Sequence, residues 1–190
     1  MSPLEIAAVC FGLANVALIV GKSVWNFPFG IVMVSLYAVI FFEARLYSEM
    51  LLQVFFLVVQ LFGWWKWLTA IEDDGELLVT WSSAPVMLAS LAATGVLALA
   101  LGSAMDRWTN AAAPYVDATV TAASVVAQFL LSFRRIENWV YWIAIDCLSI
   151  GLYVWRGLNL TAGLYVVLLL MSAAGLGAWL RSPRSMPAAA

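Results

Sequence analysis

Long apolar stretches separated by short polar connections run through the whole chain. Each stretch has about the length that an α-helix needs to cross a bilayer, roughly 20 residues. The stretches are rich in Leu and Ala and do not alternate polar with apolar residues, as the strands of a membrane barrel would. The pattern predicts seven membrane-spanning helices, at residues 4–21, 26–42, 46–69, 85–104, 114–133, 137–155 and 158–180.

Composition supports an all-α membrane protein. Hydrophobic residues make up 65% and charged residues 11% of the 190 residues, whereas soluble domains have about 45–50% and about 25%. A water-soluble sphere of this size needs more polar side chains to cover its surface. The net charge is −2 and there is no basic run, so nothing indicates nucleic-acid binding. We expect the lipid bilayer to surround the chain.

The chain contains no His and only two Cys, Cys10 and Cys147. Without His, acid–base catalysis by imidazole and His-ligated zinc or haem are excluded. We therefore predict no metal, no cofactor and no enzyme activity. Both Cys lie in apolar stretches far apart in the sequence, which predicts buried thiols rather than a disulfide. No GxxxxGK[ST] motif occurs, so ATP does not power the protein directly.

Two parts of the sequence resemble each other. A Leu is followed after 17 positions by Gly and after four more by Trp, once in each part. Upstream, each part has a Trp beside an Asn at the start of a span, and a Ser ten positions after that Trp. The matched positions are Leu46 and Leu158, Gly63 and Gly175, Trp67 and Trp179, Trp25 and Trp139, and Ser35 and Ser149.

This repeat predicts two parallel three-helix units with one linker helix between them, a 3+1+3 arrangement. Two such units joined directly would point in opposite directions, and one extra crossing makes them parallel. The predicted domains are a first unit at 1–69, a loop and linker helix at 70–113, a second unit at 114–181 and a disordered tail at 182–190. The acidic residues 72–76 are a conceivable divalent-cation site, although a solvated loop is the simpler interpretation.

Basic residues in the short loops predict the orientation. Six lie at one end of the spans, at Lys22, Lys66, Arg134, Arg135, Arg181 and Arg184, and three at the other, at Arg45, Arg107 and Arg156. Cytoplasmic loops carry the excess of Lys and Arg. The N-terminus is therefore predicted outside and the C-terminus in the cytoplasm.

A polar face inside the sixth span indicates a binding site. Polar groups in a bilayer cost free energy unless they face a cavity or a partner. Trp139, Trp142 and Asp146 lie at i, i+3 and i+7, on one helical face. Indole rings stack on aromatic guests and attract positive charge, so with a carboxylate they suit a flat organic cation. A structural hydrogen bond to another helix is the alternative for Asp146.

Other polar residues in the spans extend this site. Amides such as Gln128 can pair with a sugar or a carboxamide. Asp117 suits a helix start equally well, and Gln53 and Gln60 suit contacts between helices equally well. The predicted substrate-binding residues are Trp139, Trp142, Asp146, Gln128, Gln53, Asn26, Gln60 and Asp117.

The remaining aromatic residues have simpler interpretations. Tyr and Phe of the second and third spans are expected to pack between helices. Trp side chains near span ends usually form the interfacial belt. We expect this role for Trp64, Trp65, Trp67, Trp108 and Trp179.

Three stretches of the sequence resemble the PnuC family of vitamin transporters. They are WNFPFG at 25–30, the segment 46–67 with its LY, LQVFF and GWWKW elements, and ENWVYWIAID at 137–146. The most specific element is the pattern WxxWxxx(N/D), met by Trp139, Trp142 and Asp146. The resemblance covers nearly the whole chain.

The resemblance implies a 3+1+3 fold like that of SWEET sugar carriers, a homotrimer, and a place in the bacterial inner membrane. It implies facilitated diffusion of a vitamin, chiefly nicotinamide riboside, which a cytoplasmic kinase traps by phosphorylation. It also implies that Gln128 and the face of Trp139, Trp142 and Asp146 line the site. The alternatives are carriage of thiamine or another vitamin, an intramembrane enzyme, which the lack of His disfavours, and a structural subunit.

Overall fold

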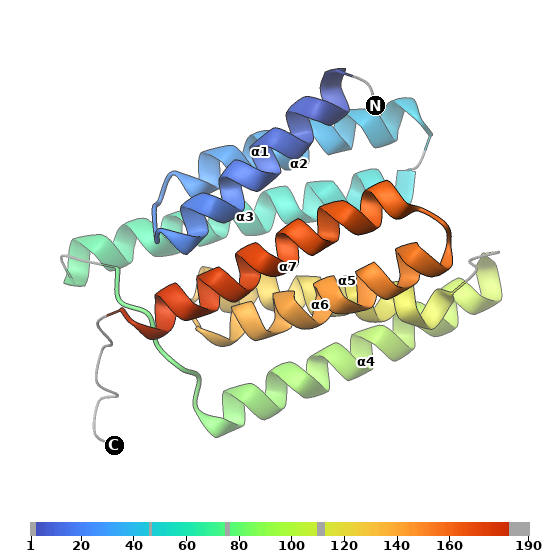
Figure 1. The fold of residues 1–190 in the computed structure, drawn as a ribbon. Helices are drawn as coiled ribbons and strands as arrows, with labels where there is room; N and C mark the ends of the chain where they lie inside the picture. The colour runs from blue at the N-terminus through green and yellow to red at the C-terminus, as the bar shows by residue number, and fades with distance from the viewer. Residues whose placement is uncertain (1–2, 46, 75–76, 110–112, 183–190) are drawn as a thin grey trace.

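The computed structural model describes residues 3–45, 47–74, 77–109 and 113–182, without the side chains of 47–49 and 72–74 (Figure 1). Within these residues the chain forms seven helices, which confirms the predicted all-α membrane fold. They are α1 (Pro3–Val20), α2 (Asn26–Glu43), α3 (Tyr47–Asp74), α4 (Ala84–Trp108), α5 (Pro114–Ser132), α6 (Glu137–Trp155) and α7 (Asn159–Leu180).

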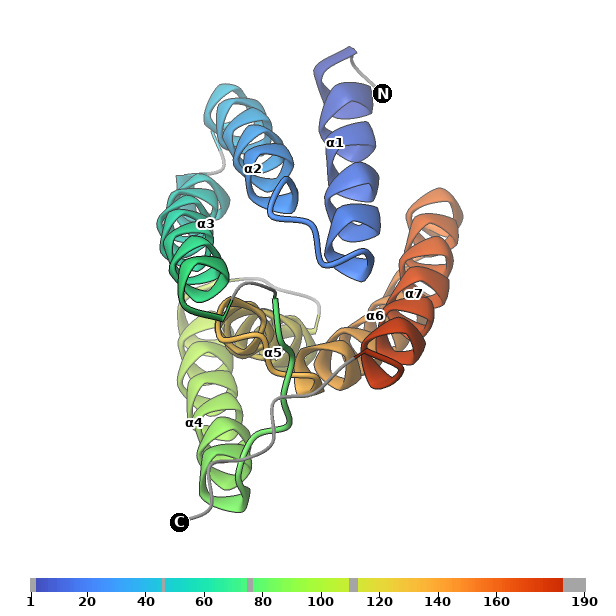
Figure 2. The ribbon, with the colours of Figure 1, turned by 90° about the vertical axis from the view of Figure 1, so that its left-hand side faces the viewer.

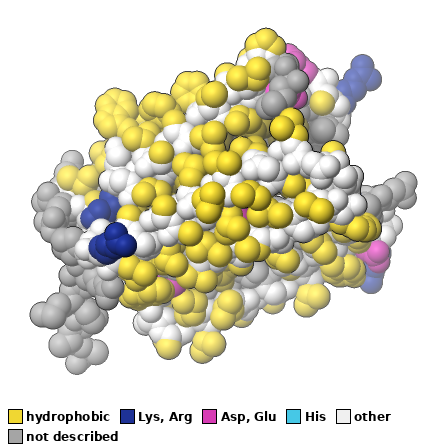
Figure 3. Space-filling model, in the orientation of Figure 1, with side chains coloured by type: hydrophobic (Ala, Val, Ile, Leu, Met, Phe, Trp, Pro, Cys, Tyr) yellow, Lys and Arg dark blue, Asp and Glu magenta, His cyan; other side chains and the backbone are white. Residues whose placement is uncertain are grey.

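Six of these helices are long and apolar enough to cross a membrane, so the chain is a multi-pass membrane protein. The exception is α6, in which Glu137, Asn138 and Asp146 lower the hydropathy. Figure 3 shows hydrophobic side chains along the lengths of the helices, with Lys and Arg at the two ends of the face drawn. This distribution suits a protein whose flanks meet acyl tails.

Contacts between neighbouring helices join six of the helices into a closed ring, which can be followed in Figure 2. Neighbours in the ring are α1 and α2, α2 and α3, α3 and α5, α5 and α6, α6 and α7, and α7 and α1. Helices α1, α3, α5 and α7 run in one direction, and α2, α4 and α6 run in the other (Figure 1). The units α1–α3 and α5–α7 therefore have the same orientation, which is consistent with the 3+1+3 arrangement.

Helix α4 lies outside the ring and packs along α5 (Figure 2). The Tyr141 hydroxyl of α6 donates to Ser90 Oγ of α4 at 3.1 Å. The connection into α4 is also fixed, because Thr80 exchanges backbone hydrogen bonds with Arg134 and Ile136. The linker is thus attached to the second unit rather than to the first.

The two units repeat each other at a constant offset of 112 positions. Lys22 and Arg134, which follow α1 and α5, are 112 apart and have φ of 54° and 59°. Arg45 and Gly157, which follow α2 and α6, are also 112 apart and have φ of 58° and 74°. Positive φ is uncommon for residues other than Gly. Its occurrence at two matched pairs of positions indicates a repeat without insertions.

Matched side chains also make matching hydrogen bonds at the starts of α2 and α6. Asn26 Nδ2 donates to Ser23 O at 2.7 Å, and Asn138 Nδ2 donates to Arg135 O at 2.6 Å. Each pair again differs by 112 positions. The amide side chain satisfies a carbonyl just before the helix, so α2 and α6 begin with the same local geometry.

The predicted pairing of Trp25 with Trp139 is wrong. It implies an offset of 114 rather than 112, as does the pairing of Ser35 with Ser149. Trp25 is 69% exposed whereas Trp139 is 1% exposed, and Phe27 occupies the position that matches Trp139. Pairing the two Trp residues shifts the sequence alignment by two positions. The residue of the first unit that matches Trp139 is Phe27, so the identity of the two Trp is misleading.

The structure also corrects the expectation of buried thiols, because Cys10 and Cys147 are both free and exposed. On a membrane protein an exposed apolar position faces lipid, so a helix can carry a small apolar thiol outward. Residues 70–74 continue α3 rather than forming a loop. The acidic side chains of 72–76 and the tail from 183 lie outside the described residues.

Candidate functional site

Four buried aromatic rings fill the end of the ring of helices at which α1, α3, α5 and α7 finish. We call Phe27, Trp67, Trp139 and Trp179 the aromatic plug; their exposed fractions are 1% or less. Phe27 and Trp67 meet edge to face with centroids 5.1 Å apart, as Trp139 and Trp179 do at 5.6 Å. Such packing is favourable for aromatic pairs, so this end of the ring is closed.

Two indole N–H groups in the plug join the two units. Trp67 Nε1 of α3 donates to Leu131 O of α5 at 3.1 Å, and Trp179 Nε1 of α7 donates to Ile19 O of α1 at 3.1 Å. Both donors and both acceptors differ by 112 positions. The interfacial-belt expectation is therefore wrong for Trp67 and Trp179, because their polar N–H groups find partners inside the protein.

The other belt residues divide between core and surface. Trp65 and Trp108 are exposed, as a belt residue should be. Trp64 is half-buried and packs against the core that contains the plug. The sequence position of a Trp near a span end therefore did not decide which way its ring points.

A cavity of about 520 Å³ lies above the plug, between the two units. This size is within the roughly 300–1,000 Å³ typical of small-ligand sites. Side chains from all six ring helices line it, and α4 contributes none of them. Trp139 lies at the plug end, whereas Tyr153, 14 residues further along α6, lines the opposite end.

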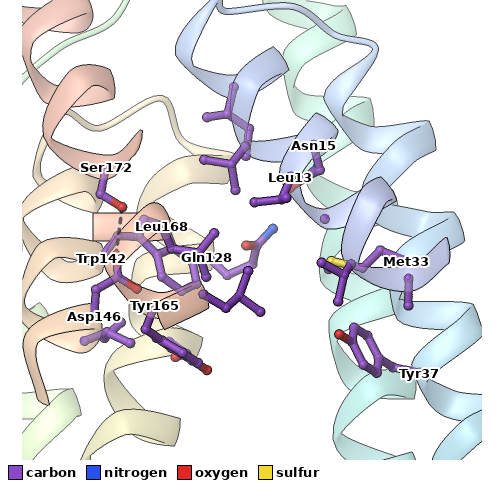
Figure 4. A pocket seen from close by; sticks show the side chains of 18 of the residues that line it. Leu13, Asn15, Met33, Tyr37, Gln128, Trp142, Asp146, Tyr165, Leu168 and Ser172 are labelled. Atoms are coloured by element: carbon purple, nitrogen blue, oxygen red, sulfur yellow. Dashed lines mark hydrogen bonds between the residues drawn. The ribbon is translucent and has the colours of Figure 1, made fainter. Parts of the chain in front are cut away.

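One face of the cavity is acidic and aromatic (Figure 4). Asp146 is 3% exposed and accepts a hydrogen bond from Ser172 Oγ of α7 at 3.0 Å. Trp142 lies one turn from Asp146 on α6 and also lines the cavity, as does Tyr165 of α7. Asp146 thus bonds to a neighbouring helix and also lines the cavity. A structural hydrogen bond and a role in binding a ligand are therefore compatible for this residue.

The cavity lining is electrostatically one-sided. Among the described residues that line it, Asp146 is the only one that is ordinarily charged, and none is Lys or Arg. A carboxylate held in an apolar enclosure strongly favours a cationic guest. The site therefore suits a small cation and offers no partner for an anion.

Amide side chains approach the cavity from both units. Gln128 of α5 points into it (Figure 4), and Gln53 and Gln60 of α3 line it as well. Asn15 of α1, also in the lining, donates from Nδ2 to Asn26 O at 2.6 Å. Amides can donate and accept at once, so they can bind the polar groups of a guest.

The structure brings together six of the eight predicted site residues: Trp139, Trp142, Asp146, Gln128, Gln53 and Gln60. Asn26 and Asp117 do not line the cavity. The side chain of Asn26 is fully buried and bonded to the turn before α2. Asp117 lies in the first turn of α5, where a carboxylate favours the helix.

Sequence reasoning missed several lining residues, among them Met33, Tyr37, Tyr165 and Ser172. Tyr37 is expected from the sequence to pack between helices, yet it faces Tyr165 across the cavity (Figure 4). The correct repeat offset would have found two of the others. Tyr165 and Ser172 lie 112 positions after Gln53 and Gln60. The described residues contain no cluster of His, Cys, Asp and Glu that could hold a metal ion.

Comparison with known proteins decides the family. The family model for nicotinamide mononucleotide transporters matches residues 2–181. The chain belongs to the nicotinamide mononucleotide transporter family. It is therefore a membrane transporter rather than an enzyme.

Several known transporters are similar to this chain along most of their length. The nicotinamide riboside transporter PnuC of Escherichia coli is 27% identical, over 93% of this chain and 82% of that protein. The riboflavin/roseoflavin transporter RibM of Streptomyces davaonensis is 27% identical, over 91% and 83%. The crystal structure of the vitamin B3 transporter PnuC superposes with a TM-score of 0.75 at 26% identity, covering 94% of this chain and 80% of that one.

Proposed function

We propose that this protein carries nicotinamide riboside across the bacterial inner membrane by facilitated diffusion. The observation that carries the proposal is the cavity between the two units, with Asp146 and Trp142 on one face. Nicotinamide riboside has a flat pyridinium ring with a fixed positive charge. The indole of Trp142 can stack on the ring, and the carboxylate of Asp146 supplies the opposite charge.

The lining favours the riboside over the phosphorylated mononucleotide. A phosphate needs Arg, Lys or a cluster of N–H donors, and the lining residues that the structure describes include neither Arg nor Lys. Asp146 would repel a phosphate instead. Phosphorylation by a cytoplasmic kinase would therefore convert a good ligand into a poor one, which traps the vitamin inside the cell.

The transport step follows from the two ends of the cavity. The aromatic plug closes one end, and the hydrogen bonds of Trp67 and Trp179 hold α3 to α5 and α7 to α1 there. For the guest to leave at this end, both bonds must break as α1–α3 rock against α5–α7. Trp139 belongs to both the plug and the cavity lining, so a ligand in the cavity can contact a side chain of the plug directly.

We further propose that the N-terminus lies outside and the C-terminus in the cytoplasm, so that the plug faces the cytoplasm. The orientation rests on the excess of basic residues at that end. Labelling of an added terminal tag in intact cells tests it, and a C-terminal tag labelled from outside would contradict it. We also propose a homotrimer, which light scattering of the purified protein tests; a monomer or dimer would contradict it.

Calorimetric titration of the detergent-purified protein tests the substrate. We expect nicotinamide riboside to bind with a Kd in the micromolar range or tighter and the mononucleotide to bind at least tenfold more weakly. Thiamine and riboflavin complete the ligand panel. Heat from either of these, with none from nicotinamide riboside, would overturn the substrate assignment. Uptake of labelled nicotinamide riboside into proteoliposomes without an ion gradient tests facilitated diffusion.

A further inference from the structure

Asp146 lies midway along the helix that carries it. It is nine residues from Glu137, where α6 begins, and nine from Trp155, where α6 ends. At 1.5 Å per residue each distance is roughly 14 Å, about half the thickness of a hydrocarbon core. Its hydrogen-bond partner Ser172 is also in the interior of a helix (Figure 4). The matching position of the first unit is the neutral Val34, so this charge is placed in one unit alone.

The other charged side chains that the structure describes lie near the ends of the helices. Glu5, Asp117 and Glu137 are in the first turns of α1, α5 and α6, and Lys66 adjoins the aromatic plug in the sequence. Among the described residues that line the cavity, no Lys or Arg stands beside Asp146. The cavity therefore contains one negative charge that no cation of the described lining offsets.

Rocking of the two units changes the side from which Asp146 is reached. The cavity lies between α1–α3 and α5–α7, and a carrier opens such a cavity to one side of the membrane at a time. Water conducts the potential of its own side into an open cavity, because its dielectric constant is high. A net charge in the cavity thus crosses much of the membrane potential at each rocking step, even when Asp146 itself hardly moves.

We propose that Asp146 neutralises the cationic substrate while the loaded carrier rocks, so that the membrane potential acts on the return of the empty carrier; this rests on the proposed function. Nicotinamide riboside carries one positive charge and the carboxylate one negative charge, so the loaded cavity has no net charge. The empty cavity keeps the negative charge, which an inside-negative potential drives outward. Each cycle moves one positive charge inward, and the potential favours uptake without a coupled ion.

Exchange between two saturating pools of substrate isolates the loaded step. Proteoliposomes filled with unlabelled nicotinamide riboside take up the labelled compound, while a potassium gradient with valinomycin sets the potential. We expect the wild type to exchange at the same rate with and without an inside-negative potential. In Asp146→Asn the loaded cavity keeps one positive charge, for which about 100 mV shifts an equilibrium about 50-fold. With equally populated states, exchange by this variant should slow about threefold.

A neutral guest tests the same charge balance from the other side. Benzamide riboside has a carbon in place of the charged ring nitrogen of nicotinamide riboside. With this guest the loaded wild type keeps the charge of Asp146, so its exchange should become sensitive to the potential. Asp146→Asn with the neutral guest has no net charge, and the insensitivity should return. A merely structural role of Asp146 would not give this recovery. Asp117→Asn, outside the cavity lining, is the matched control and should behave as the wild type.

Net uptake into vesicles without internal substrate tests the empty step. Nicotinamide riboside should accumulate about 50-fold at an inside-negative potential of about 100 mV, since one positive charge enters per cycle. Uptake that ignores the potential and releases protons from the vesicles would mean that a proton neutralises the empty cavity, which would overturn the proposal. Potential-sensitive exchange of nicotinamide riboside by the wild type would also overturn it. A wild type that transports no nicotinamide riboside would refute the proposed function itself, an outcome distinct from these.

Discussion

The two three-helix units have one backbone plan and two different sets of cavity side chains. At positions 112 apart, Asp146 of the second unit corresponds to Val34 of the first, and Trp142 corresponds to Gly30. The turns and the plug hydrogen bonds are kept in both units, whereas the carboxylate of Asp146 and the indole of Trp142 have no counterpart at the matching positions of the first unit. The comparison shows that the repeated backbone forms the two units that move against each other. The binding site depends on the side chains in which the two units differ.

The largest effect on ligand binding is expected when Asp146 is replaced by Val, the residue at the matching position of the first unit. Asp146→Val removes the carboxylate and should weaken nicotinamide riboside binding by roughly 10–100-fold, the value of a charge-assisted contact. Asp146→Asn should be milder, because the amide can still accept a hydrogen bond. Calorimetry measures both. Equal affinities for the wild type and both variants would remove Asp146 from the site.

The stacking surface is the next difference to remove. Trp142→Leu should weaken the ligand about tenfold, since stacking of a base on an aromatic ring is worth about 1–3 kcal/mol. Trp142→Phe should lose less, because a smaller ring face remains. Trp155→Leu on the same helix is the control, as its side chain is exposed. If Trp142→Leu and Trp155→Leu bind equally well, the ring does not stack on Trp142.

Substitutions in the aromatic plug test the hydrogen bonds that both units have in common. Trp67→Phe and Trp179→Phe each remove one indole N–H, and we expect each to lower the midpoint of thermal unfolding by about 2–5 °C. Because the two rings are in contact, with centroids 6.2 Å apart, the effect of the double variant should differ from the sum of the two single effects. Trp65→Phe, at an exposed ring, is the control. Size-exclusion chromatography after heating measures the folded fraction, and strongly unequal effects would contradict the symmetric role.

The smallest effect is expected in the matched turns that follow α2 and α6. Arg45 and Gly157 both have positive φ, and a Cβ on Gly157 would meet open space. Gly157→Ala should therefore destabilise by about 1 kcal/mol through its backbone conformation alone. Arg45→Gly should stabilise slightly by the converse argument. The same heating assay separates the two signs, and a shift in the same direction for both would refute the backbone explanation.

Much of the fold could be predicted because hydropathy reports directly on the bilayer. Helix α6, although its hydropathy falls short of that of the six candidate spans, was found because charged residues bracket it. The face of Trp139, Trp142 and Asp146 follows from helical periodicity, and the structure places all three at the cavity. The repeat was detected at Gly63 and Gly175 but misaligned at Trp25, since in apolar sequences chance identities are frequent.

The errors about which side chains point into the protein share one physical cause. In a bilayer the lipid and the protein interior are equally apolar, so hydropathy does not tell which face of a helix points inward. Cys10 and Cys147 were expected inside and point outward, whereas Trp67 and Trp179 were expected at the interface and point inward. The two Trp rings point inward because their N–H groups donate to carbonyl groups of other helices. No local sequence pattern reveals such a contact.

The sequence by itself determined that this chain crosses a membrane, where its helices lie, and that α6 has one polar face. Those properties depend on the chain's own composition and on helical periodicity. The tertiary structure alone decided that α1–α3 and α5–α7 close into a ring, and that Gln60 and Gln128 line one cavity. It also decided that Asn26 and Asp117 lie elsewhere. These outcomes depend on contacts between residues far apart in the chain, and periodicity within one helix does not specify its neighbour.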